Sequence, residues 1–161
     1  MFFWHIGLSI SFFRFVFKDF SADLRWLIAG VLFPEFIYIF NTFVKFEIEY
    51  FLFIGTYPEI GHTLLWAVAM LLFVMIFSKR DTQKRKNGLL VVIGTFFHLL
   101  FDFMWLRPEV LFFPLQFGPN PQRIPINLSV LFIQEVIGLL YLIPKLNSKE
   151  KFKRLMSEGL I

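Results

Sequence analysis

The chain has 161 residues, of which 57% are hydrophobic and only 17% are charged, and its mean hydropathy is +0.67. A soluble domain is usually about 45–50% apolar and about 25% charged, and a chain this short has too much surface to bury the excess. The composition argues against a soluble enzyme, a disordered segment and a collagen-like fibre. It favours one integral membrane domain over residues 1–161. Because the chain has no cysteine, disulfides, thiolate metal sites and thiol nucleophiles are excluded.

Five hydrophobic stretches predict an all-α, polytopic membrane fold. They cover about residues 2–17, 24–40, 61–77, 89–106 and 127–143. The first is shorter than the roughly 20 residues of a spanning helix, so it is either a full span or a partial, re-entrant one. Asp23 is a suitable N-cap for the second stretch. Pro34 lies inside that stretch and is expected to kink or interrupt the helix.

Two connecting segments are expected to lie outside the hydrocarbon. Residues 41–60 form an acidic, amphipathic connector that suits the membrane interface. Residues 107–125 contain five of the eight prolines. Irregular backbone exposed to lipid leaves polar groups unsatisfied, so this proline-rich loop is expected to fold against protein or to lie at the interface.

Charge predicts the orientation of the chain. Residues 78–88 carry a net charge of +4 and the tail 145–161 carries +3. Basic segments next to apolar stretches stay in the cytoplasm, which predicts the N-terminus outside and the C-terminus inside the plasma membrane of a prokaryote. The connector and the proline-rich loop are then outside. No nucleic-acid-binding fold signature accompanies the basic segments, so nucleic acid is not an expected partner.

The fourth stretch carries His98 and Asp102 at positions i and i+4. This spacing stacks both side chains on one face of a helix. Ionisable groups inside a bilayer cost roughly 2.5–3.5 kcal/mol each, so they require a partner or a function. An imidazole and a carboxylate on one face form part of a ligand set for zinc or another divalent metal. The alternative is a hydrogen-bonded pair that only stabilises helix packing.

The predicted topology places three further ionisable residues toward the outer side. His5 lies near the start of the first stretch, and His62 opens the third, where a merely solvated histidine is the alternative. Glu35 lies roughly 16 Å along the second helix at 1.5 Å per residue, too deep for a snorkelling carboxylate. All three histidines of the chain thus converge with Glu35 and Asp102 on one predicted site.

Three more charged residues are weaker candidates for the site. Glu135, near the middle of the fifth stretch, either orients a ligand histidine through its second ring nitrogen or pairs with Arg14. Arg107 and Arg123 flank the proline-rich loop. Arginine makes bidentate contacts with phosphate or carboxylate, although anchoring to lipid headgroups is the alternative.

The residues around His98 also resemble a known family. His98 to Gly118 reads HLLFDFMWLRPEVLFFPLQFG. This segment resembles the HLxLDxMWxxPxxLxWPLxG signature of YdjM-like membrane-bound predicted metal-dependent hydrolases. Other elements follow in the family's order: WHIGLS around His5, LRWLIAGVLFPEF (Leu24 to Phe36) in place of GxxxPD, and GHTLL around His62 in place of HRGxTHS.

The resemblance implies site positions at His5, Glu35, His62, His98 and Asp102. The chain departs from the pattern at Glu35, where the family typically has aspartate, and around His62, where one histidine remains of HRGxTHS. Both departures bear on the metal geometry, the number of metal ions and the activity. The family's hydrolase label is itself inferred from its motifs.

Two hypotheses of different class follow. In the first, a divalent metal, zinc rather than manganese, is held by His62, His98 and Asp102, with His5 or Glu35 completing the set. Whichever of Glu35 and Asp102 is not a ligand acts as general base on a lipid-linked or amphiphilic ester, and a phosphoester is favoured. In the second, the polar residues form a structural metal site, an ion-binding site or a packing cluster in a non-enzymatic membrane protein, which could form a homo-oligomer.

Overall fold

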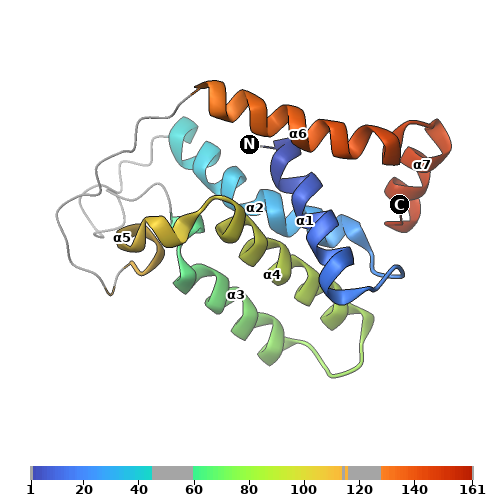
Figure 1. Ribbon diagram of the computed structural model, residues 1–161. Coiled ribbons are helices and arrows are strands. Elements are labelled where there is room, and N and C mark those ends of the chain that lie inside the picture. Colours follow the sequence, from blue (N-terminus) through green and yellow to red (C-terminus); the bar gives the residue numbers. More distant parts are fainter. Residues whose placement is uncertain (1, 45–59, 114, 116–127, 161) are drawn as a thin grey trace.

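The computed structural model describes residues 2–44, 60–113, 115 and 128–160, and these are helical with no strand among them (Figure 1). The predicted all-α class is therefore confirmed. The elements in chain order are α1 (Phe2–Phe17), α2 (Leu24–Val44), η2 (Ile60–His62), α3 (Leu64–Phe77), α4 (Gln83–Phe101), η3 (Met104–Leu106), α5 (Pro108–Leu111), α6 (Leu128–Leu146) and α7 (Lys149–Glu158).

The first two helices follow the hydrophobic stretches closely. α1 has the predicted bounds, and α2 begins directly after Asp23, whose Oδ1 accepts a hydrogen bond of 3.1 Å from the Arg25 amide. α2 continues through Pro34 without a break, so the expected interruption is wrong. Proline cannot donate to the carbonyl of Gly30, four residues earlier. The Thr95 hydroxyl of α4 lies within hydrogen-bonding distance of that carbonyl, at 3.2 Å, and of the Val91 carbonyl of its own helix, at 3.1 Å, so its proton can partly replace the missing donor.

The boundaries of α4 differ from the prediction. The helix begins at Gln83, six residues before the predicted start, because Thr82 caps it: its hydroxyl accepts from the Arg85 amide at 3.3 Å. Most of the predicted basic loop is therefore the first part of a helix. α4 ends at Phe101 rather than at the predicted Leu106. Asp102 is the C-cap residue, and the next residue, Phe103, has a left-handed backbone conformation with φ 55°.

The later part of the chain contains two α-helices that were not predicted, α5 and α7. α6 begins one residue after its predicted start and extends to Leu146. The tail then forms α7, which Ser148 caps at its N-terminus. The last residues of the predicted fourth stretch form η3, and the start of the proline-rich loop forms α5, while most of the rest of the loop and residues 45–59 of the connector lie outside the described residues.

Glycines bring two pairs of helices into backbone contact. A Cβ at Gly30 of α2 would overlap the Val91 carbonyl of α4, and a Cβ at Gly94 of α4 would overlap the Leu27 carbonyl of α2. A Cβ at Gly7 of α1 would lie 3.0 Å from the Gly138 carbonyl of α6, and a Cβ at Gly138 would overlap the backbone of Phe3 and Trp4. Small residues at helix crossings are typical of membrane proteins, where close packing rather than the hydrophobic effect holds helices together.

The C-terminal end packs on the start of α2. The Gly159 carbonyl accepts a hydrogen bond of 2.8 Å from the Leu24 amide. The Arg25 guanidinium donates to the carbonyls of Met156 and Ser157, both at 2.9 Å. α7 thus lies at the same end of the molecule as the α1–α2 turn (Figure 1).

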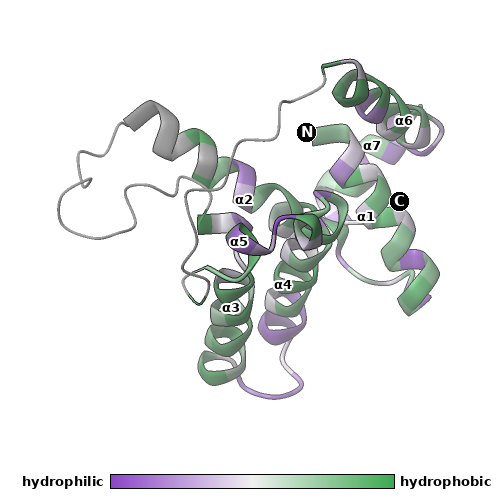
Figure 2. Cartoon of the chain, turned by 60° about the vertical axis from the view of Figure 1, so that its left-hand side comes forward, coloured by the Kyte–Doolittle hydropathy of each residue, from purple (hydrophilic) through white to green (hydrophobic). Residues whose placement is uncertain are grey.

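The surface of the helices is apolar. Among the described residues, α6 is the one helix long and apolar enough to span a bilayer, and α1 and α3 are apolar but shorter. Ile76 and Phe77 of α3 and Phe132 of α6 are 71%, 74% and 70% exposed. Figure 2 shows α3 as hydrophobic along its length, with hydrophilic residues gathered at the α3–α4 turn and the start of α4. Five separate spans remain a prediction.

The glycine contact between α2 and α4 can be tested by adding one methyl group. In Gly94→Ala the two backbones must separate, and overpacking costs about 1–3 kcal/mol. We expect the melting temperature of the purified protein in detergent to fall by roughly 3–10 °C. The control is Gly88→Ala on the same helix, where the new methyl group meets only the Val74 side chain at 2.9 Å. Equal melting temperatures for the two variants would contradict the close backbone contact.

Candidate metal centre

Four side chains form a buried group that we call the His–Asp cluster: His5, His62, His98 and Asp102. Asp102 lies at its centre, at the C-cap of α4, where its amide donates to the His98 carbonyl at 2.9 Å. The i, i+4 spacing places the Asp102 Oδ2 atom 3.5 Å from the Nε2 atom of His98. The predicted juxtaposition of these two residues on one face is therefore confirmed.

The other two histidines reach Asp102 from different elements. His62 ends η2, and its Nε2 atom lies 3.5 Å from Asp102 Oδ2 and 3.1 Å from His98 Nε2. His5 belongs to α1, and its Nε2 atom lies 3.0 Å from the other carboxylate oxygen, Oδ1. The His5 ring also stacks on the His98 ring at 4.3 Å between centroids. Three segments far apart in sequence thus meet at one carboxylate.

Neighbouring polar groups hold these elements in place. Thr63 caps α3, since its hydroxyl accepts from the Trp66 amide at 3.1 Å and donates to the Ile60 carbonyl at 2.8 Å. This closes the turn that presents His62. At the start of α1, the Phe3 amide donates to Glu135 Oε2 of α6 at 2.8 Å. Glu135 thereby positions the helix that carries His5.

The three histidines of the cluster are buried, whereas the Asp102 side chain is 15% exposed. His5 and His98 have no exposed surface, and His62 is 6% exposed. Burial and the neighbouring His98 lower the pKa of His62, which lies before the first residue of α3, to about 4. His62 is therefore neutral at pH 7, and a neutral imidazole keeps the lone pair that a metal requires.

The donor set and its spacing fit a divalent metal. His5, His98 and Asp102 each offer a ligand atom within 4.8 Å of the others, and His62 contacts two of the three. Donors bonded at about 2.0–2.1 Å in a tetrahedron are about 3.3 Å apart. Four of the donor separations are 3.0 to 3.5 Å, although His5 faces Oδ1 of Asp102 whereas His62 and His98 face Oδ2. The residue types and their proximity therefore fit a divalent metal.

The remaining candidate residues fall into different places. Glu35, in α2, is half-buried and interacts electrostatically with His62, His98 and Asp102. The Arg107 Nε atom lies 4.0 Å from Glu109 Oε1 at the start of α5. Arg123 lies outside the described residues.

Several positioning contacts were not anticipated from the sequence. The predicted partners of Glu135 were a ligand histidine and Arg14, whereas the structure joins it to the Phe3 amide and directs Arg14 Nη1 to the Asp19 carbonyl. Thr63 and Thr95 were not singled out. The threonine directly before the third hydrophobic stretch is an N-cap signal that could have identified Thr63.

The fold and the His–Asp cluster together define an α-helical membrane protein with the donor set of a divalent-metal site. More particularly, the chain belongs to the YdjM inner membrane protein family, whose model matches residues 2–161. The resemblance noted from the sequence is therefore confirmed, and with it membrane location. Comparisons with curated proteins and with solved structures gave no match.

Metal content tests the cluster. We expect wild-type protein reconstituted with zinc to retain about one ion per chain after dialysis, because imidazole nitrogens and a carboxylate are strong zinc ligands. His98→Ala removes a donor that contacts both His62 and Asp102, so the retained zinc should fall at least tenfold. Ser9→Ala is the matched control, because Ser9 is also buried and lies one turn after His5. Equal zinc content in His98→Ala and wild type, measured by elemental mass spectrometry, would rule out this centre.

Proposed function

We propose that the chain is a membrane-bound, metal-dependent hydrolase that acts on a lipid-linked or amphiphilic ester. The observation that carries the proposal is the convergence of three histidines from three elements on Asp102. Family membership and the hydrolase label inferred from the family's motifs support the same reading. Zinc is the preferred metal, since a nitrogen-rich donor set suits it better than it suits manganese.

Each residue has a distinct part in this proposal. Asp102 and two of the three histidines would hold the metal, which would supply an acidified water and polarise the ester oxygen. Glu35 is the general base in this proposal, because it is a half-buried carboxylate that interacts electrostatically with His62, His98 and Asp102. It accepts the proton of the attacking water.

The substrate class follows from charge and location. Arg107 begins the segment that follows the cluster along the chain, and Arg123 lies further along that segment in sequence. Guanidinium groups suit the bidentate recognition of phosphate, which favours a phosphoester. The apolar surfaces of α3 and α6 support a substrate that arrives from the lipid.

The proposal includes the orientation of the chain in the membrane. The chain crosses the membrane five times with its N-terminus outside, and the cluster lies toward the outer leaflet. α4 supports this orientation, since its basic start and the ligand pair at its other end are separated by the helix length. The α3–α4 turn and α7 then lie on the cytoplasmic side.

The variant Glu35→Gln distinguishes a loss of hydrolysis from a loss of metal binding. The amide cannot accept the proton, so hydrolysis of a lipid phosphoester should fall about 10²–10⁴-fold, while zinc content stays at the wild-type level. Glu150→Gln, an exposed change on α7, is the control and should leave both unchanged. Loss of zinc in Glu35→Gln would make Glu35 a ligand instead. Bound zinc without hydrolysis of any tested ester in the wild type would leave a structural metal site in a non-enzymatic protein.

Single cysteines test the orientation, because the chain has none of its own. Asp81→Cys at the α3–α4 turn should react with a membrane-impermeant maleimide only after the cells are permeabilised. Glu109→Cys on α5 should react in intact cells. The wild-type chain supplies the background. The reverse pattern would invert the orientation and place the cluster toward the cytoplasmic leaflet.

A further inference from the structure

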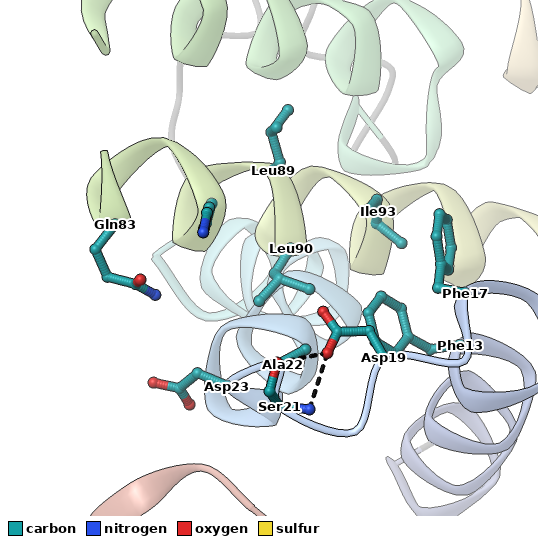
Figure 3. A pocket seen from close by; sticks show the side chains of 11 residues that line it. Phe13, Phe17, Asp19, Ser21, Ala22, Asp23, Gln83, Leu89, Leu90 and Ile93 are labelled. Atoms are coloured by element: carbon teal, nitrogen blue, oxygen red, sulfur yellow. Dashed lines mark hydrogen bonds between the residues drawn. The ribbon is translucent and has the colours of Figure 1, made fainter. Parts of the chain in front are cut away.

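A second cavity lies at the opposite ends of α1 and α4 from the His–Asp cluster. It has a volume of about 470 Å³ and is bounded by the last turns of α1, the α1–α2 turn and the first half of α4 (Figure 3). This volume is in the range of pockets that bind small organic molecules. None of its lining residues belongs to the cluster.

The lining is divided into an apolar part and a polar part. The apolar part comes from α1 and α4 and comprises Phe13, Phe17, Leu89, Leu90 and Ile93. The polar part lies toward the α1–α2 turn and the start of α4 and includes Asp19, Ser21, Asp23, Gln83 and Lys86. An amphiphile has the same division between chain and headgroup.

The polar part of the lining contains two opposite charges that a ligand can contact, those of Asp19 and Lys86. Asp19 Oδ1 accepts hydrogen bonds from the Ser21 amide at 2.8 Å and the Ser21 hydroxyl at 2.7 Å (Figure 3). These bonds lower the pKa of Asp19, so the carboxylate is ionised at pH 7. Asp23, by contrast, is already paired with Arg25, at 2.7 Å. Within the described part of the chain, Lys86 makes no ion pair.

The surroundings favour a lipid over a water-soluble ligand. Phe15 and Phe20, which flank the lining residues in sequence, are 76% and 70% exposed. Phenylalanine side chains this exposed suit contact with a membrane, and the family is one of inner membrane proteins.

We propose that this cavity binds a zwitterionic phospholipid of the phosphatidylethanolamine class. The ammonium group donates to Asp19, the phosphate pairs with Lys86, and an acyl chain lies against Phe13 and Ile93. An ethanolamine ammonium has N–H donors for the carboxylate. A choline group has none, and a glycerol headgroup has no positive charge. The site is independent of any hydrolase activity.

Native mass spectrometry of the detergent-solubilised full chain tests the proposal. The protein is titrated with phosphatidylethanolamine, phosphatidylcholine and phosphatidylglycerol of identical acyl chains. We expect the ethanolamine lipid to bind about five- to tenfold better than either of the others, as one charge-assisted hydrogen bond allows. Equal binding of all three lipids would overturn the proposal.

Two variants assign the headgroup contacts. Asp19→Asn keeps the oxygen that Ser21 uses but removes the charge, so it should abolish the preference for ethanolamine. Lys86→Gln should weaken all three phospholipids. The matched controls are Asp81→Asn and Lys84→Gln, which change the same charges at the same end of the molecule outside the cavity.

The controls should bind like the wild type, and melting temperatures confirm that every variant is folded. If Asp19→Asn keeps the preference, or if Asp81→Asn loses it equally, the assignment of the ammonium to Asp19 is wrong.

Discussion

The structure depends on one buried carboxylate. Asp102 contacts imidazoles from α1, η2 and α4, and two of those rings have no exposed surface. An isolated charge in such surroundings would be expensive, whereas one that accepts hydrogen bonds or shares a cation is stabilised. The carboxylate therefore holds three segments together, and each segment needs it. Its position at the end of α4, just before the left-handed Phe103, allows it to face all three.

The helices around this carboxylate rely on contacts between backbones. Pro34 leaves the Gly30 carbonyl without its helical partner, and the Thr95 hydroxyl of α4 lies within hydrogen-bonding distance of it. The same glycine permits the close approach that brings Thr95 within reach. The neighbouring helix thus provides a partner for a carbonyl that proline leaves without one, and this contact helps to set the axial position of α4 relative to α2. The same axial position determines where Glu35 lies relative to His98.

Much of this arrangement could be predicted from the sequence, for identifiable reasons. Hydrophobic stretches located most of the helices, and the cost of ionisable groups in apolar helices pointed to the three histidines and Asp102 as one group. The i, i+4 rule brought His98 to Asp102. Contacts between distant segments could not be predicted from these local patterns. The partner of Glu135 is an amide more than a hundred residues away in the sequence. The glycine crossings depend on which helices pack together, which local periodicity does not give. α7 was missed because its apolar positions are few and its charges dominate the local pattern.

The contact between Gly7 and Gly138 has a consequence for biogenesis. α1 is synthesised first, yet α6, the helix it meets at these glycines, follows more than a hundred residues later. Chains emerge from the ribosome in order, and early segments must wait for late partners. His5 therefore gains its final support only after α6 has entered the membrane. A chain that stalls before α6 contains every histidine but lacks the helix that positions the first of them, so the His–Asp cluster is completed only when α6 has been made.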